Sequence, residues 1–508
     1  MPNTIGIFII FPTTLFKNID LIKELLETKQ INKIFIIEDS IYFTKFKFHK
    51  QKILLHRASL KYYYDYLLIN FGTIISYIDF LYSDSFYKKI SKIDMPIFMY
   101  DPIDHALLDN IKKKLSNINI YENLGFMETY DDLLSYNENI INNKYLHDNF
   151  YKWNRTRLNI LLDKKNKPLF GKWSFDTSNR FPFNDSYICP SIYPSNFFND
   201  NIENYIDDAK KYVDKYFKTN FGTYDDFFFP ITHIQAIKLL NHFLKNKIDT
   251  FGTFEDAVSS DIVSGSHSCL SSSLNIGLIT AKDCIDATIK KFNKLTSNEQ
   301  KKQIHNYEGF IRQIIGWRSY MRLLYEFQGK QMYEMNFFNH SNKITKHWYN
   351  ATTNIYPVDF LINKVKKYAY LHHIERLMYI GNWALLSQIN PKQIYKWFMI
   401  TCIDAYEWVM IPNVQGMSQH SLDNSIVSMM TRPYFSSSNY LNKMSDLVLK
   451  NNNWTDIWND LYYYFIYNNI NYLKHNYSVS RQVRHWNNKT KNEQHIIINN
   501  ARKYLSNL

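Results

Sequence analysis

The sequence predicts a two-part fold: a Rossmann-like α/β domain with a parallel sheet, followed by a large all-helical domain. Short continuous apolar runs at 5–11 and 33–38 are typical of buried parallel strands, and helical spacing over 19–29 joins them into a βαβ unit. Beyond about residue 205, apolar residues recur at the 3.6-residue helical period almost to the end. The 508 residues therefore divide into an α/β domain (1–130), a connection (131–205) and a helical domain (206–508).

The α/β domain is expected to contain two more strands, at 73–77 and 95–100, and a second helix over 49–66. Ligands of such sheets bind beyond the carboxyl ends of the strands. Glu38 directly follows the second strand and is a candidate pocket residue, with an ordinary loop carboxylate as the alternative.

The connection is expected to be irregular from about 140 to 205, because five proline and glycine residues punctuate it. They are Pro168, Gly171, Pro182, Pro190 and Pro194. Helices are then expected over 232–244, 279–292, 307–327, 358–383, 391–410 and 455–472. Asn390 and Pro391 are typical of a helix start.

The net charge is +13, from 60 Lys and Arg against 47 Asp and Glu. This surplus favours a polyanionic partner, nucleic acid before membrane. The four cysteines are scattered and form no C-x-x-C pair, so they indicate neither a disulfide framework nor a zinc site. No apolar run approaches the roughly 18 residues of a membrane span, and the first run lacks the preceding charge of a signal peptide. We expect a soluble intracellular protein.

Two adjacent histidines, His372 and His373, lie in an apolar stretch that is expected to form one helix with Arg376. His373 and Arg376 are three apart and share a face. Buried imidazoles need partners, so two structural histidines are the alternative. Neighbouring helix positions cannot converge on one ion, which argues against a metal site.

The next expected helix carries Trp397 and Asp404, seven positions apart on one apolar stripe. A carboxylate there is costly unless it is paired, and Arg376 is the natural partner. Such a pair could also be purely structural.

Two further segments suggest a polar pocket. The Ser-rich loop 265–277 leads into a helix and could present N–H groups and hydroxyls to a diphosphate, although an ordinary Ser-rich loop is the alternative. Segment 307–318 interleaves Glu, Arg, Gln and Trp with apolar residues, as a pocket-lining helix would; a helix with a solvated polar side is the alternative.

These pieces, in this order, resemble the photolyase/cryptochrome superfamily, in particular its photolyase-related branch, which includes the bacterial (6-4) photolyases that carry an iron–sulfur cluster. The resemblance covers nearly the whole chain. Its most specific stretches are 171–176 with Asn179 and Arg180, 308–313 with 316–318, 372–378, 404–409, 412–418, and 438–440 before 443–446.

The resemblance implies FAD bound within the helical domain. Its phosphates would contact His267, Ser268 and Ser271, with Asn275 close by, while Gln313 lines the pocket and Arg376 and Asp404 flank the isoalloxazine ring. Met410 would lie opposite flavin N5, where relatives often have a polar residue.

The resemblance also assigns roles around the flavin. His373 matches the catalytic histidine that protonates a (6-4) lesion, with His372 beside it. Trp397, Trp348 and Tyr406 match positions that relay electrons to the flavin, and Trp317 and Arg318 would face the lesion and the DNA.

The implied activity is light-driven repair of UV-damaged DNA by a monomeric carbon–carbon lyase, with the (6-4) photoproduct favoured over the cyclobutane dimer. The alternative is a cryptochrome-like blue-light photoreceptor with the same flavin but no repair. A third hypothesis is a nucleic-acid-binding protein without flavin.

The sequence departs from the family pattern at two places. Tyr356 occupies the position of the first cluster cysteine, and 447–451 contains no cysteine, so we expect no iron–sulfur cluster. Relatives carry a Gly-Asp-Gln-Leu run that helps bind a lumazine antenna, where this chain has Phe11 to Leu15, although Glu38 and residues 49–52 persist. The sequence leaves antenna binding open.

Overall fold

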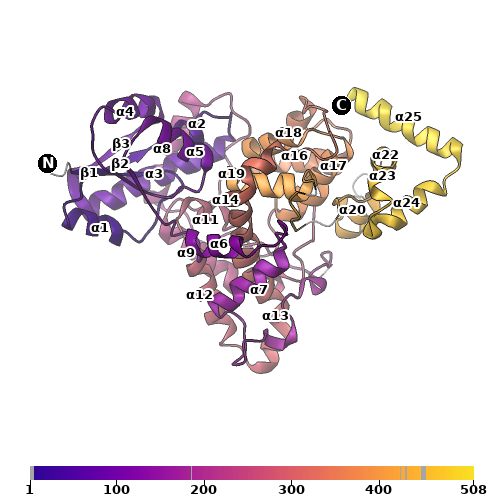
Figure 1. The fold of residues 1–508 in the computed structure, drawn as a ribbon, viewed down its shortest axis with the longest axis horizontal. Coiled ribbons are helices and arrows are strands. Elements are labelled where there is room, and N and C mark those ends of the chain that lie inside the picture. The colour runs from indigo at the N-terminus through magenta and orange to yellow at the C-terminus, as the bar shows by residue number, and fades with distance from the viewer. Residues whose placement is uncertain (1–4, 185, 424, 430–431, 448–452) are drawn as a thin grey trace.

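The computed structural model describes residues 5–184, 186–423, 425–429, 432–447 and 453–508. It begins with a five-stranded parallel sheet in the order β3-β2-β1-β4-β5 (Figure 1). The strands are β1 (Gly6–Ile10), β2 (Ile31–Ile37), β3 (Ile75–Ile78), β4 (Ile97–Tyr100) and β5 (Ile118–Tyr121). The predicted α/β class and the four predicted strands are confirmed.

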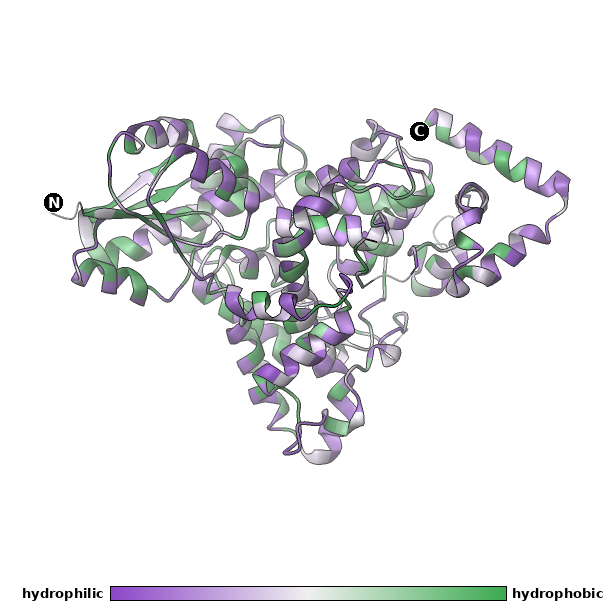
Figure 2. Cartoon of the chain, in the orientation of Figure 1, coloured by the Kyte–Doolittle hydropathy of each residue, from purple (hydrophilic) through white to green (hydrophobic). Residues whose placement is uncertain are grey.

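The edge strand β5 was not expected from the sequence. It is only four residues long, and Asn119 and Ile120 are exposed, so it lacks the continuous apolar run that marks the inner strands. The central strand β1 is buried along its whole length, and hydrophobic strand residues appear in green in the sheet half of Figure 2.

The helices of this half are α1 (Asp20–Glu27), α2 (Ser40–Phe43), α3 (Lys50–Phe71), α4 (Ser83–Ile90) and α5 (His105–Lys114). Helix α3 carries buried polar residues instead of an apolar stripe alone. Gln51 donates from Nε2 to the carbonyls of Thr223 and Lys367 at 3.1 and 2.6 Å, and Lys52 donates to the carbonyl of Ala405. These bonds attach α3 to backbone of the helical half.

The connection is less irregular than expected. It contains α6 (Tyr130–Glu138) and α7 (His147–Leu158), and α7 packs against residues 312–318 of the helical half. Helix α7 was not predicted because its sequence is mostly polar and shows no apolar stripe. It buries only four residues, Phe150, Tyr151, Asn154 and Arg155. Two short 3-10 turns follow, at Leu169–Gly171 and Asp176–Ser178.

Helix α8 (Asp200–Tyr216) returns to the sheet half and lies along α3. The remaining helices form the lower and right parts of Figure 1. They are α9 (His233–Asn246), α10 (Ile248–Phe251), α11 (Ser271–Ile276), α12 (Ala281–Phe292), α13 (Ser297–Ile311), α14 (Ser319–Glu334), α15 (His347–Asn350), α16 (Tyr356–Tyr368), α17 (Asn382–Leu386), α18 (Pro391–Thr401), α19 (Glu407–Ile411), α20 (Ser438–Met444), α22 (Thr455–Asn468), α23 (Ile470–Leu473), α24 (Ser480–Asn487) and α25 (Lys491–Asn507).

Two predicted helices are interrupted by several residues, and a third, 455–472, is broken only at Asn469, between α22 and α23. The stretch 358–383 breaks after α16, where Ala369 has a positive φ of 52°, so His372 precedes the following helical turn and His373 begins it. The stretch 391–410 breaks after Thr401, so Asp404 lies in a loop between α18 and α19. The expectation that Trp397 and Asp404 share one helical stripe was therefore wrong. Neither of these two longer breaks contains glycine or proline. The apolar periodicity therefore continues through them in the sequence and predicts one uninterrupted helix in each case.

Three segments are π-helical: Arg312–Arg318, Glu375–Gly381 and Pro412–Ser418. Each continues an α-helical segment with an extra residue in its turn. Such turns are rare and occur frequently at functional sites.

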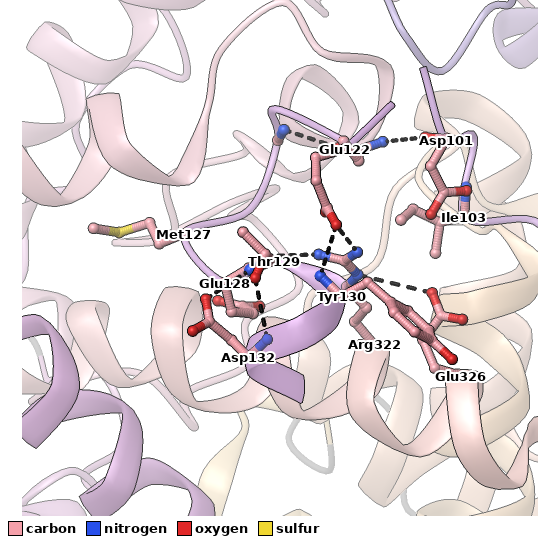
Figure 3. Close-up of polar contacts among 12 residues, drawn as sticks. Asp101, Ile103, Glu122, Met127, Glu128, Thr129, Tyr130, Asp132, Arg322 and Glu326 are labelled. Carbon is pink, nitrogen blue, oxygen red and sulfur yellow. Dashed lines mark hydrogen bonds and ion pairs between the residues drawn. The ribbon is translucent and has the colours of Figure 1, made fainter. Parts of the chain in front are cut away.

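A buried arginine connects α14 to the loop that follows β5 (Figure 3). Arg322 donates from Nη1 to the carbonyl of Glu128 at 2.8 Å and lies 3.7 and 3.8 Å from the carboxylates of Glu122 and Glu326. Its guanidinium also stacks on the ring of Phe126, 4.7 Å from the centroid. The two halves are thus joined by charged as well as apolar contacts. Among the described residues, no helix is long and apolar enough to cross a membrane.

Candidate functional site

A cavity in the helical half is bounded by the loop before α11, the three π-helical segments and the loop that contains Asp404. Apolar side chains such as Leu270, Phe310, Leu377 and Val414 form much of its wall. Twelve of the predicted site residues line it: His267, Ser268, Ser271, Asn275, Gln313, Trp317, Arg318, His372, His373, Arg376, Asp404 and Met410. Residues that are far apart in the sequence therefore converge on one space.

The charged centre of the cavity is the pair Arg376 and Asp404. Arg376 donates from Nη2 to Oδ1 of Asp404 at 2.8 Å and from Nε to the carbonyl of Leu371 at 2.7 Å. The pairing expected from the sequence is confirmed, although the carboxylate comes from a loop. Burial opposes the charge on Arg376, yet the negative charge of Asp404 keeps the pKa of this guanidinium above its ordinary value.

Two residues expected at phosphates bond to the Asp404 loop. Ser271 donates to Oδ2 of Asp404 at 2.7 Å, and Asn275 donates to its backbone carbonyl at 2.9 Å. Their side chains therefore fix the carboxylate from the side of α11, an arrangement that no sequence pattern indicates.

A lysine of the sheet half also holds this loop. Lys52 donates to the carbonyl of Ala405, and its ammonium lies 4.8 and 4.7 Å from the ring centroids of Phe48 and Tyr406. Burial lowers the pKa of Lys52 to about 7, although Asp404 nearby opposes the shift. The loop is thus held from both halves of the molecule.

The histidines at the cavity wall form a stacked pair that the sequence did not predict. The rings of His267 and His372 have centroids 4.5 Å apart and are inclined by only 16°. Burial holds the pKa of each well below its ordinary value, so both are neutral at pH 7. Nε2 of His267 and Nδ1 of His372 are buried without a hydrogen-bond partner among the described residues.

His373 also lines the cavity and, unlike His372, is exposed there. Crowding by the cavity wall and the nearby cations Arg376 and Arg312 lower its pKa. Its imidazole is therefore neutral at pH 7 in the protein alone. A negatively charged ligand would favour the protonated form.

Gln313 is fixed by a glutamate that no sequence motif marks. Gln313 donates from Nε2 to Glu255, which also accepts from Asn179 at 3.4 Å and lies 3.6 Å from the guanidinium of Arg312. Burial raises the pKa of Glu255 to about 7. Glu255 lines the cavity, and only the folded structure identifies it as a site residue.

Trp317 and Arg318 lie at the wall, held by side chains of other elements. The Trp317 ring stacks on His147, with centroids 3.8 Å apart at 14°. Arg318 lies over the rings of Phe126 and Trp408, 4.2 and 4.8 Å from their centroids, and donates to the carbonyl of Leu274 at 3.1 Å. Loss of hydration lowers the pKa of Arg318 to about 9. This placement favours a role inside the cavity over contact with a DNA backbone.

The predicted relay residues lie behind the wall. Trp397 donates from Nε1 to the carbonyl of Trp348 at 3.0 Å, and the two rings are 5.9 Å apart. Trp348 also stacks on Trp383, 4.2 Å between centroids, an indole that no motif singled out. All three indoles are fully buried, and Phe398 connects Trp397 to the cavity. Tyr406 lies apart, with its hydroxyl 3.4 Å from Nε2 of His56.

Glu38, the candidate pocket residue of the sheet half, is fully buried and engaged by the protein itself. It accepts from Arg57 at 2.9 Å, from the hydroxyls of Tyr77 and Tyr212 at 2.6 Å each, and from the backbone N–H of Phe80 at 3.0 Å. Its carboxylate serves as a junction between β2, α3 and α8.

The cysteines form no disulfide and gather no metal ligands in the part of the chain that the structure describes. Three of them are buried and Cys189 is exposed, and in the same segments no group of three or more His, Cys, Asp or Glu could hold an ion. Tyr356 begins α16, whereas 448–451 of the predicted cysteine-free segment lie outside the described residues.

A parallel-sheet domain is thus joined to a helical half that contains an apolar-walled cavity with a buried ion pair, the architecture of a two-domain protein with a ligand pocket in its helical half. The family described as deoxyribodipyrimidine photo-lyase-related protein matches residues 8–229. A (6-4) photolyase of Agrobacterium fabrum (strain C58 / ATCC 33970) is 33% identical over 369 residues, which cover 71% of this chain and 70% of that protein.

Two solved structures share the fold. A cryptochrome of Synechocystis sp. PCC6803 has a TM-score of 0.55 at 13% identity, covering 87% of this chain and 89% of its own. An archaeal photolyase from Sulfolobus tokodaii with two FAD molecules has a TM-score of 0.53 at 14% identity, covering 99% and 100%. The chain belongs to the photolyase/cryptochrome superfamily, in its photolyase-related family.

Proposed function

We propose that the cavity binds FAD and that the protein repairs UV-damaged DNA with blue light, the (6-4) photoproduct being its preferred lesion over the cyclobutane dimer. The observation that carries this proposal is the convergence of the twelve predicted site residues on one cavity. The 33% identity to a (6-4) photolyase supports it.

The residues present fit a flavin dinucleotide. The apolar wall offers a surface for aromatic rings, and the Arg376–Asp404 pair offers a cation and an anion for their polar edge. Nε2 of His267 and two guanidinium nitrogens of Arg318 are buried without hydrogen-bond partners among the described residues. Bound phosphates would supply acceptors for these donors. His267, Ser268, Ser271 and Asn275 would line the phosphate side, and Met410 would contact the ring system. To donate to a phosphate, Ser271 would have to redirect the hydroxyl that it now donates to Asp404, whereas Asn275 has a second amide N–H.

When bound, FAD would supply light absorption and one-electron chemistry. The chain's own contribution is to position the flavin ring and to exclude water from it. Arg376 and Asp404 fix charge beside the ring, and the cavity wall keeps water away. The column of Trp397 and Trp348 offers oxidisable indoles behind that wall, with Tyr406 as a further candidate.

The lesion would enter the cavity flipped out of the duplex, which costs little for a damaged, poorly stacked base. His373 would deliver a proton to the lesion, since phosphates nearby would raise its pKa toward neutrality. Trp317 would contact the lesion. The net charge of +13 would hold the DNA backbone without reading its sequence. We propose that the protein works as a monomer.

The same proposal excludes an iron–sulfur cluster, because Tyr356 replaces the first cluster cysteine. For the antenna, Glu38 already has four donors, so a lumazine would have to displace a protein contact to reach it.

The test combines a spectrum with a repair assay. Purified protein should show flavin absorption, and denaturing extraction should release FAD and report any second chromophore. The reduced protein, illuminated with blue light under anaerobic conditions, should convert oligonucleotides with a (6-4) photoproduct faster than those with a cyclobutane dimer. Bound flavin with both lesions unchanged would instead support the photoreceptor alternative. Protein that binds no flavin would refute both.

A further inference from the structure

The side chain that faces the ring of His372 is a carboxylate. Glu375 accepts the backbone N–H of His372 through Oε2 at 2.9 Å, and its Oε1 lies 3.5 Å from Nε2 of the imidazole. Both residues are buried, Glu375 completely. A carboxylate at this distance favours the tautomer with the proton on Nε2, in the way that buried carboxylates orient other functional histidines.

The carboxylate has a cation of its own. Lys364, on α16, donates from Nζ to Oε1 of Glu375 at 2.5 Å and is 6% exposed. The ammonium of Lys364 therefore offsets the negative charge of Glu375, so that this carboxylate does little to stabilise a positive charge on His372. Without the lysine, a buried carboxylate beside an imidazole would favour the imidazolium.

We propose that Lys364 and Glu375 are positioning residues that lock His372 as a neutral Nε2–H imidazole and so leave proton transfer in the cavity to His373. This rests on the proposed function and divides the labour between the two adjacent histidines. His372 becomes a fixed part of the wall, stacked on His267, and His373 becomes the group that gains and loses a proton.

The groups around His372 agree with this division. Lys364 faces it from α16, His373 and Arg376 from its own segment, and His267 from the loop before α11, with Lys247 beyond it. Apart from Glu375, every one of these is a base or a cation, so each disfavours a charge on His372. Only the carboxylate could support that charge, and Lys364 already engages it.

The test reads His372 directly by nitrogen NMR of histidine-labelled protein. In the wild-type chain, the ring of His372 should remain neutral across the neutral pH range, with the proton on Nε2. Lys364→Met should release Glu375 and let His372 titrate within that range. The matched control is Lys366→Met, an exposed lysine on the same helix, which should leave His372 unchanged.

The second readout is the pH profile of repair. A charge on His372 would lower the pKa of His373, the proposed general acid. The alkaline limb of the profile, where activity falls as His373 loses its proton, should therefore move to lower pH by roughly one unit in Lys364→Met. Where Lys364→Met folds poorly, the double variant Lys364→Met with Glu375→Leu removes both charges. It should fold, keep His372 neutral and lose the Nε2–H preference.

A charged His372 in the wild-type chain, or an unchanged ring in Lys364→Met, would overturn the inference. The NMR measurement needs no repair activity. Absence of repair with a locked His372 would therefore refute the proposed function alone.

Discussion

Nη2 of Arg376 and Oδ1 of Asp404 lie 2.8 Å apart, although the two residues are 28 positions apart and neither belongs to an ordinary α-helix. One side chain leaves a π-helical segment and the other a loop. The loop is fixed by Ser271, Asn275 and Lys52, so the position of the ion pair depends on side chains from both halves of the molecule.

Replacing Asp404 by Asn should leave Arg376 as a largely buried cation without its counter-charge. We expect a loss on the order of 3 kcal/mol in the free energy of unfolding, together with weaker flavin binding. Urea denaturation and flavin titration measure the two effects. The matched control is Asp423→Asn, which alters an exposed carboxylate and should change neither quantity. A loss as small as that of the control would contradict a buried role for the pair.

The stacked indoles predict a route for electrons. Trp348→Phe and Trp397→Phe should abolish blue-light reduction of bound flavin in the presence of an external thiol, because both interrupt the column behind Phe398. Chemical reduction by dithionite should be unaffected. Trp383→Phe tests whether the stack on Trp348 extends the route.

Trp486→Phe, a buried indole on α24, serves as the control for the loss of a large ring. Unchanged photoreduction in Trp397→Phe would exclude the column as the route, whatever the result for Trp383.

His233 should contribute a loss of stability as the solution becomes acidic. Burial lowers the pKa of His233 from its ordinary 6.5 to about 4, and its Nε2 bonds to the carbonyl of Leu15 at 2.8 Å. Between these values the unfolded chain binds a proton that the folded protein does not. The stabilisation is therefore complete above pH 6.5 and lost toward pH 4, about 2 kcal/mol of it between about pH 7 and 5.

Urea denaturation at neutral pH and near pH 5 measures this loss, and His233→Gln should reduce the difference between the two values. Asp104 and Glu255, whose pKa values are raised to about 7, act in the opposite direction, because they bind protons in the folded protein first. An identical pH dependence in His233→Gln would show that folding does not lower the pKa of His233.

The junction at Glu38 predicts a structural effect in the sheet half. Tyr212→Phe removes a hydroxyl that donates to the fully buried carboxylate at 2.6 Å, which should cost about 1–3 kcal/mol and loosen α8. Hydrogen exchange of α8 and denaturation measure these effects. Tyr216→Phe, on the same helix with an exposed ring, should be neutral. Equal effects of the two variants would mean that Glu38 gains nothing from Tyr212.

The sequence was informative where one periodicity ran uninterrupted. The inner strands and the long helices follow from it, and the motifs point to residues that line one cavity. It failed where bonds from other elements decide the backbone. Nothing within 402–406 resembles a loop, since its residues are mostly apolar; Asn275 and Lys52 hold it there by bonding to its carbonyls. Likewise Ala369 adopts a positive φ, for which alanine gives no signal.

The partners of the site residues were hidden for the same reason. Trp383 stacks on Trp348 from 35 positions away, and Glu375 stands out in the sequence only as one letter of a motif. A motif identifies which side chains meet, whereas tautomers and counter-ions depend on neighbours that only the folded chain brings together.

The polar face of α3 has a consequence for engineering this protein. A domain is easily exchanged between relatives when its interface with the rest of the protein is mainly apolar and makes few specific hydrogen bonds. Here Gln51 and Lys52 reach across the interface to specific carbonyls of the helical half. A chimera that imports the sheet domain of a relative would need to import these two side chains as well, or the transplant would disturb the very loop that carries Asp404.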